Sequence, residues 1–276
     1  MIDKDVRGPA PEASARLDVV VALRDGLAHL PTLIAMLRAQ NTQIDNVVFV
    51  DDASTDGSAE YLRAQCPVWT VATTDANRGP AAARNLGAAS TDAGWLLFLD
   101  VDDRPDPTWY SAFASAAVQH ARIVRRGVTI VEGEGRRESL PGPGLSGCFM
   151  VGSWAVERSL WDGVGGYDPR YRYSENTELS LRMRRTLGLV IGSASPEEII
   201  LPGCGLEVVQ DEQARVRNAR HALSRREAAL RLLAEHRADL TSEELYNLCR
   251  VVFSTDLRTR RVDRLPVDLL RLLRHR

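Results

Sequence analysis

Short apolar runs alternate with helix-period segments along about the first hundred residues of this chain. Each run is short enough for a strand, and between the runs apolar residues recur at every third or fourth position, as on one face of a helix. This alternation is typical of β-α-β units, which build a mainly parallel sheet covered by helices. The predicted strands are Leu17–Leu23, Val47–Val50, Val68–Ala72 and Trp95–Leu99, and the predicted helices are Leu27–Ala39, Gly57–Ala64 and Pro80–Ala89.

Beyond about residue 105 the pattern loosens. We expect a helix at Trp109–Gln119, a strand at Val128–Val131 and a glycine-rich polar loop at Glu132–Leu145. A mixed α/β region over 146–201 and an arginine-rich helical region over 207–276 follow. Thr241 and Glu244 have the spacing of a capping box, which predicts the start of a helix. The expected organisation is an N-terminal arm over 1–16, a domain over 17–205 with halves 17–104 and 105–205, and a helical extension over 206–276.

The composition excludes several classes of protein. With 276 residues, 44% of them hydrophobic, the chain can bury a sizeable core, and a net charge of −2 offers no general attraction for nucleic acid. Lys4 is the only lysine, so the P-loop motif and Schiff-base chemistry are excluded. No signal-peptide core and no run of roughly 18 apolar residues occurs, which predicts a cytoplasmic protein.

Carboxylates follow two of the predicted strands directly. Asp51 and Asp52 come after one strand, and Asp100, Asp102 and Asp103 come after another. Ligands of parallel sheets bind at the carboxyl ends of the strands, and clustered carboxylates are kept chiefly where a cation offsets their repulsion. Oxygen ligands favour Mg²⁺ or Mn²⁺. The alternatives are a turn with a helix cap at the first cluster and a solvated acidic loop at the second.

Two glycine-containing segments are candidate phosphate-binding motifs. Asn77-Arg78-Gly79-Pro80 opens a predicted helix that also carries Arg84, so free backbone N–H groups and a guanidinium are expected near one another. Residues 142–147 match the dinucleotide-binding pattern G-x-G-x-x-G, but polar residues 136–139 stand where a strand is required and Pro143 lies inside the motif. A dehydrogenase is therefore not predicted, and we interpret this segment as a loop near an acceptor.

In their order along the chain, these segments resemble the family 2 glycosyltransferases, which are inverting enzymes with the GT-A fold. The resemblance extends over roughly residues 17–200. The segments that carry it are Val19-Val20-Val21-Ala22, Val50-Asp51-Asp52-Ala53-Ser54-Thr55-Asp56, Asn77-Arg78-Gly79 with Ala83-Arg84-Asn85-Leu86-Gly87, Leu99-Asp100-Val101-Asp102-Asp103, Gly165-Gly166-Tyr167-Asp168 and Ser174-Glu175-Asn176-Thr177-Glu178-Leu179-Ser180-Leu181-Arg182.

The resemblance implies an α/β fold with a Rossmann-like, mainly parallel sheet, a nucleotide-binding half over 17–104, an acceptor half over 105–205 and a C-terminal helical extension. It implies a UDP-, dTDP- or GDP-linked sugar donor and a hydroxyl acceptor. The implied donor-binding residues are Ala22, Arg24, Asp51, Asp52, Asn77, Arg78, Arg84, Asp100 and Val101. It also implies a DxD-type motif in which Asp102, with Asp100 and Asp103, binds Mg²⁺ or Mn²⁺, because such an ion stabilises the departing nucleoside diphosphate.

The chain departs from the family pattern at the general base. Many relatives carry Glu-Asp where this chain has Glu175-Asn176, and an amide cannot accept the proton of the acceptor. Glu175 is the expected replacement, and Glu178, about one helical turn further on, is the alternative. If Glu178 only pairs with Arg182, the base is lost and the chain is a degenerate nucleotide-sugar-binding relative. A sugar-phosphate nucleotidyltransferase is a further alternative.

Two further features bear on the acceptor. Five aromatic residues between 154 and 173 either stack on a sugar ring or pack in the core: Trp154, Trp161, Tyr167, Tyr171 and Tyr173. Residues 264–276 alternate leucines with arginines, as in a basic amphipathic helix. Such a helix could contact the inner face of a membrane, which would suit a lipid-linked acceptor, or it could dock on its own domain or on a second subunit.

Overall fold

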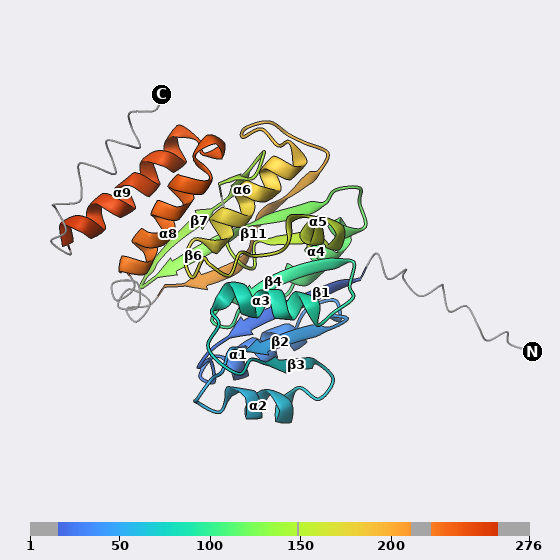
Figure 1. The fold of residues 1–276 in the computed structure, drawn as a ribbon. Helices are drawn as coiled ribbons and strands as arrows, with labels where there is room; N and C mark the ends of the chain where they lie inside the picture. Colours follow the sequence, from blue (N-terminus) through green and yellow to red (C-terminus); the bar gives the residue numbers. More distant parts are fainter. Residues whose placement is uncertain (1–15, 148, 211–221, 259–276) are drawn as a thin grey trace, which may run out of the picture.

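The centre of the fold is a nine-stranded sheet, shown in the computed structural model that describes residues 16–147, 149–210 and 222–258 (Figure 1). The strand order is β3-β2-β1-β4-β10-β6-β11-β5, with β7 paired to β6. The strands are β1 (Leu17–Leu23), β2 (Val47–Asp51), β3 (Thr70–Thr73), β4 (Trp95–Asp100), β5 (Arg104–Pro105), β6 (Ile123–Glu132), β7 (Gly135–Ser139), β10 (Trp154–Glu157) and β11 (Glu198–Val209). The short strands β8 (Pro141–Gly142) and β9 (Ser146–Gly147) pair separately.

Helices cover both faces of the sheet (Figure 1). One face packs against α1 (Leu30–Arg38), α2 (Ser58–Gln65) and α4 (Trp109–Ala117). The other face packs against α3 (Pro80–Ala89), α5 (Arg158–Val164) and α6 (Glu175–Leu187). Alternate residues of β1 explain this division, because Val19 and Val21 belong to the first core and Val20 to the second.

The register of the parallel strands brings their carboxyl ends to one edge. β1 lies between β2 and β4, and it pairs Leu23 with Asp51 and Ala22 with Asp100. These strands are buried on both faces, which is why their sequences are continuous apolar runs. The predicted β-α-β pattern of the first hundred residues is therefore confirmed, and its polar strand ends lie together.

Some predicted bounds were wrong. The predicted loop at 132–145 contains β7, a strand of exposed polar residues that pairs antiparallel with β6 and so has no apolar alternation to predict it. The predicted helix Leu27–Ala39 begins at Leu30 instead. Pro31 stands in the first turn of that helix, where the missing N–H of proline leaves no hydrogen bond unmade.

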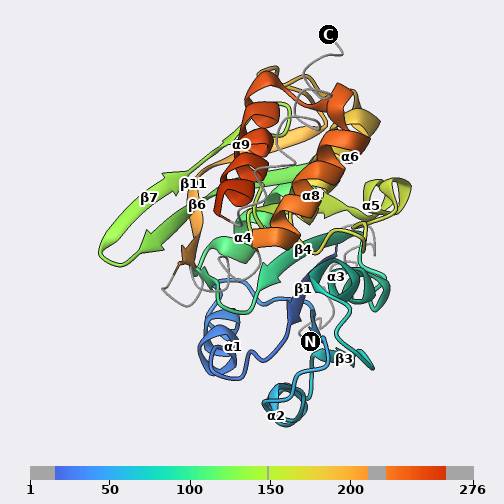
Figure 2. The same ribbon diagram turned by 60° about the vertical axis from the view of Figure 1, so that its left-hand side comes forward.

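Helices α8 (Ala222–Glu235) and α9 (Ser242–Arg258), joined by the 3-10 helix η2 (Arg237–Asp239), follow the sheet. The predicted boundary at 205 falls inside β11, which continues the sheet to Val209. Figures 1 and 2 show α8 between α6 and α9, and its Leu232 packs with Leu181 of α6. The capping box is confirmed, because the Glu244 N–H donates to the Thr241 hydroxyl and the Thr241 N–H to the Glu244 carboxylate.

Two predictions concern segments outside the described residues: the N-terminal arm, up to residue 15, and the basic amphipathic helix over 264–276. Among the helices that the structure describes, none is both long enough and apolar enough to cross a membrane.

Candidate functional site

A cleft of about 580 Å³ opens at the carboxyl ends of β1, β2 and β4. This is the point where the strand order reverses around β1, and such crevices are the usual ligand sites of open α/β sheets. The cleft is lined by Ala22, Leu23, Arg24, Asp52, Asn77, Gly79, Pro80, Ala83, Arg84, Asp100, Arg172, Tyr173 and Ser224. It therefore brings together predicted donor-binding residues from four separate segments of the chain.

Asp52 organises the loop that leads into α3. Its Oδ1 accepts hydrogen bonds from the Thr74 hydroxyl at 2.8 Å and the Arg78 N–H at 2.9 Å, and its Oδ2 accepts one from the Gly79 N–H at 2.7 Å. Gly79 has a φ of 89°, a conformation that favours glycine. The Asp-Asp and Asn-x-Gly segments of the sequence thus meet because one carboxylate holds the other loop in place.

Three of the predicted donor-binding residues do not line the cleft. Asp51 is buried, and its Oδ1 accepts a hydrogen bond from the Ser54 N–H at 2.7 Å. The Arg78 guanidinium turns to Asp75, 2.7 Å away, so its contribution to the site is its backbone N–H. Val101 packs against the apolar core. A position near a strand end in the sequence is therefore not sufficient for a side chain to line the cleft.

Arg84 joins the two carboxylates nearest to the predicted chemistry. Its Nη2 lies 2.8 Å from Asp100 Oδ1 and its Nη1 lies 2.9 Å from Glu175 Oε1. The side chain is 5% exposed, and its guanidinium stands over the Tyr167 ring at 5.4 Å. Burial would lower the pKa of Arg84, but the charge of Asp100, with Tyr167 and Glu175, raises it above its ordinary value. Arg84 is therefore a permanent cation that neutralises both carboxylates.

The acidic cluster after β4 fits a metal ion only with help from a ligand. Among the described residues, no three His, Cys, Asp or Glu side chains are grouped to hold a metal by themselves. Asp103 is buried, and burial together with nearby Asp100 and Asp102 raises its pKa well above the ordinary range. That leaves Asp100 and Asp102 as partly exposed oxygen donors. Mg²⁺ is commonly held by one or two carboxylates plus substrate phosphates, and this donor set suits that mode.

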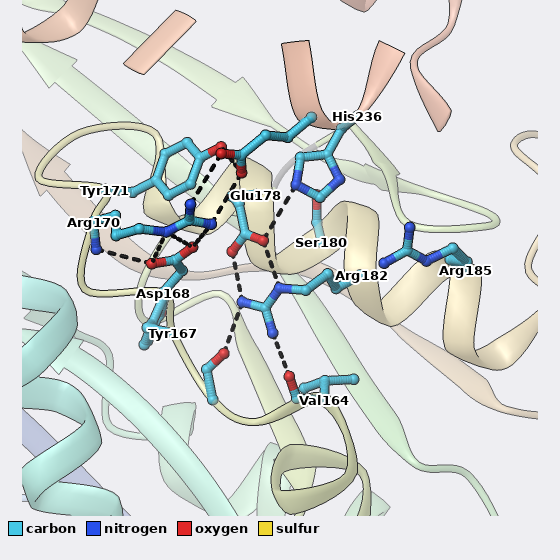
Figure 3. A network of polar contacts seen from close by, with 12 residues as sticks. Val164, Tyr167, Asp168, Arg170, Tyr171, Glu178, Ser180, Arg182, Arg185 and His236 are labelled. Atoms are coloured by element: carbon cyan, nitrogen blue, oxygen red, sulfur yellow. Dashed lines mark hydrogen bonds and ion pairs between the residues drawn. The ribbon is translucent and has the colours of Figure 1, made fainter. Parts of the chain in front are cut away.

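The two glutamates proposed for the base occupy different surroundings. Glu175 pairs with Arg84, which lines the cleft. The buried Glu178 pairs instead with two nitrogens of Arg182, and its Oε1 lies 3.4 Å from His236 Nε2 (Figure 3). Glu178 lines a second cleft of about 390 Å³. The geometry thus favours Glu175 over Glu178 for contact with a ligand in the first cleft.

Asn176 is held away from any role in proton transfer. Its Oδ1 accepts a hydrogen bond from the Tyr167 hydroxyl at 2.8 Å. Burial raises the pKa of Tyr167 well above its ordinary value, so the phenol remains a proton donor. The amide at this position therefore completes a neutral hydrogen bond beneath the Arg84 guanidinium.

Sequence reasoning missed Arg172, Tyr173 and Ser224 as cleft residues. Tyr173 did belong to the predicted aromatic group, but Trp154, Trp161, Tyr167 and Tyr171 are buried in the core. The core interpretation is therefore confirmed for these four, and only Tyr173 lines the cleft. Ser224 lies in a separate helix with no recognisable motif, so no local signal could have found it.

Comparison with known proteins agrees with this architecture. Residues 18–149 match the model of the family described as glycosyl transferase family 2. A pre-mycofactocin glycosyltransferase of Mycobacterium tuberculosis is 28% identical over 208 residues, which cover 66% of this chain and 43% of that protein. An uncharacterized glycosyltransferase of Haemophilus influenzae is 36% identical over 87 residues, which cover 32% of this chain and 29% of that protein. The chain thus spans less than half the length of either relative.

Solved structures of S. aureus TarS, residues 1–349, share the fold. The complex of that protein with UDP-GlcNAc has a TM-score of 0.62 at 16% identity and covers 86% of this chain and 70% of TarS 1–349. The complex with UDP has a TM-score of 0.59 at 16% identity, over 86% and 69% of the two chains. Residues 18–149 are thus similar to glycosyl transferase family 2, and the chain has the GT-A fold that the sequence resemblance implied.

Proposed function

We propose that this protein is an inverting, metal-dependent glycosyltransferase that moves a sugar from a nucleoside-diphosphate donor to an acceptor hydroxyl. The observation that carries the proposal is the cleft at the carboxyl ends of β1, β2 and β4, where Asp52, Asn77, Arg84 and Asp100 meet. The bound UDP and UDP-GlcNAc of the TarS complexes support a uridine nucleotide as the first donor to test. A glycan, a glycolipid or a secondary metabolite would be the product.

The donor half of the reaction follows from the charges of the cleft. Asp100 and Asp102 would hold Mg²⁺ or Mn²⁺ together with phosphate oxygens of the donor. When bound, such an ion stabilises the negative charge that develops on the departing nucleoside diphosphate. Arg84 lines the same cleft, and its guanidinium holds Asp100 in a fixed orientation. The chain thus supplies a preorganised edge at which leaving-group charge can accumulate.

The acceptor half requires one proton acceptor. Inversion follows from a single displacement, in which the acceptor oxygen attacks the anomeric carbon while a carboxylate removes its proton. We assign this role to Glu175, whose side chain is 12% exposed and is oriented by Arg84.

A binding and turnover assay tests this function. Full-length protein is heated with UDP, dTDP, GDP and their sugar derivatives, with and without Mn²⁺, because ligands that bind the native state raise the midpoint of unfolding. Metal-dependent stabilisation by one nucleotide family identifies the donor class. Release of a nucleoside diphosphate from the stabilising sugar donor then demonstrates transfer or hydrolysis, whereas release of pyrophosphate would indicate a nucleotidyltransferase.

Asn176 favours one other candidate function, a nucleotide-sugar-binding protein without catalysis. Its amide occupies the position of the family's usual base and is already paired with Tyr167. Stabilisation by a sugar nucleotide without any release of nucleoside diphosphate would support this candidate. Turnover that Glu175→Gln abolishes would instead support the glycosyltransferase.

A further inference from the structure

One wall of the cleft comes from residues beyond the 18–149 segment that matches the family model. Arg172 and Tyr173 lie on the loop that precedes α6, and Ser224 lies in the first turn of α8. These two segments are distant in sequence but border the same cavity. The C-terminal helices therefore reach the site itself.

Arg172 supplies the charge of this wall. Its side chain is exposed, and its Nη2 donates a hydrogen bond to the Asn77 carbonyl oxygen at 3.4 Å. A Cβ built on Gly79 would lie 3.7 Å from Arg172 Nη1, so the guanidinium rests against the loop that opens α3. Within the part of the chain that the structure describes, Arg172 forms no ion pair with a carboxylate. Its planar fork is therefore available to an anionic ligand, and it matches phosphate geometry.

The carboxylates that line the cleft are already compensated. Asp52 accepts three hydrogen bonds from the loop that leads into α3, and Asp100 pairs with the buried Arg84. Neither of them needs Arg172 as a partner. Among the described residues the charge of Arg172 is therefore not neutralised by a carboxylate, and a cation that lines a cleft attracts a polyanion.

A polar network fixes the loop that carries Arg172 against α8 (Figure 3). Arg170 bonds to Asp168 at 2.6 Å and to Glu235, the last residue of α8, at 3.0 Å through each of two nitrogens. The Tyr171 hydroxyl donates to the same Glu235 carboxylate at 3.2 Å. The Tyr171 ring is buried in the cluster formed with α8. Arg172 thus follows two residues that are both anchored to the C-terminal extension.

We propose that Arg172 binds the diphosphate of the nucleotide donor, and that Arg170 and Glu235 are positioning residues that hold it there. This inference rests on the proposed glycosyltransferase function and extends the donor site to the C-terminal helices. A hydrogen-bonded contact to a charged group of this kind corresponds to roughly a tenfold change in affinity.

Calorimetric titration of the full chain tests the contact directly. UDP and uridine are titrated into the wild type, Arg172→Gln, Arg172→Lys and, as a matched control on α2, Arg63→Gln. We expect Arg172→Gln to weaken UDP binding roughly tenfold and uridine binding not at all, with partial recovery in Arg172→Lys and no change in Arg63→Gln. Equal loss for UDP and uridine, or unchanged UDP binding, overturns the inference. If the wild type binds no nucleoside diphosphate from a UDP, dTDP and GDP panel, the proposed function itself fails.

A double-variant experiment tests the positioning role. Glu235→Gln removes the charge that Arg170 faces without removing the packing of α8, and we expect it to weaken UDP binding less than Arg172→Gln does. In Arg172→Gln/Glu235→Gln the two losses should not add, because Glu235 acts only through Arg172. Additive losses overturn the positioning role. Unfolding midpoints of all variants are measured in parallel, so that a fold defect is recognised as such.

Discussion

A methyl group at Gly87 is expected to push α3 away from the sheet. A Cβ built there would lie 2.4 Å from Val20 Cγ1 and 3.0 Å from Val50 Cγ2, and both valines are fully buried. Overpacking of this kind costs about 1–3 kcal/mol, while alanine in place of glycine favours a helix by about 1 kcal/mol. Because a Cβ cannot remain 2.4 Å from Val20 Cγ1, we expect the cost of overpacking to lie near the upper end of this range. Gly87→Ala should therefore lower the free energy of unfolding by about 2 kcal/mol.

Urea unfolding of three variants measures this effect. Val20→Ala alone leaves a cavity and should cost about 2 kcal/mol, but in Gly87→Ala/Val20→Ala the new methyl group takes up the vacated space. The double variant should therefore be at least about 1 kcal/mol more stable than the sum of the single effects predicts. Gly163→Ala in α5 is the matched control, because no atom lies within 4 Å of a Cβ placed on Gly163, and it should not destabilise. Strict additivity, or a Gly87→Ala variant as stable as the wild type, would refute the close approach.

The remaining predictions concern charged groups. Asp102→Ala should remove the Mn²⁺-dependent part of UDP binding, and calorimetry that finds the same dependence as in the wild type counts against a metal role. Glu175→Gln should lower turnover by about a hundredfold or more with donor affinity nearly unchanged, and equal activity would exclude it as the base. Arg125→Met leaves the buried Glu198 carboxylate, 2.7 Å from Arg125 in the structure, without its cation, and should lower the free energy of unfolding in urea by about 3–5 kcal/mol. A decrease below about 1 kcal/mol would contradict this expectation. Burial opposes ionisation of Asp56, but N–H and hydroxyl donors outweigh this effect and lower the pKa of Asp56 in the folded protein. The ionised Asp56 therefore stabilises the fold above the pKa of the unfolded chain, and this contribution is lost as the pH falls through the pKa of the folded protein. Asp56→Asn should therefore lose less stability than the wild type on acidification below about pH 4, as unfolding midpoints would show.

The parallel half of the fold was predictable because its strands are buried on both faces. β1, β2 and β4 are continuous apolar runs, and the polar residues that follow them mark the edge where ligands bind. β7 escaped prediction because its residues are exposed and polar, so only the pairing with β6 makes it a strand. The apolar pattern therefore predicted the strands that are buried, and it failed for the strand that forms only by pairing with a neighbour.

The candidate site was predictable in its parts but not in its pairing. Arg84 and Glu175 are 91 positions apart, and no local pattern states that one guanidinium joins Glu175 to Asp100. Motif reasoning placed Arg84 near a phosphate, while the structure shows it between two carboxylates. Ser224 reaches the cleft only because α8 packs on α6, which is a tertiary fact.

The late position of α8 in the chain has a consequence for synthesis on the ribosome. Chains emerge from the N-terminus, and domains begin to fold as they emerge. β1 to β4 can pair before residue 222 has been translated, whereas Ser224 and the Arg170–Glu235 ion pair become available only afterwards. During that interval the nascent protein has an incomplete cleft and leaves Tyr171 and Leu181 without their partners on α8. A nascent chain arrested before α8 should therefore be a target for chaperones that bind exposed apolar surface.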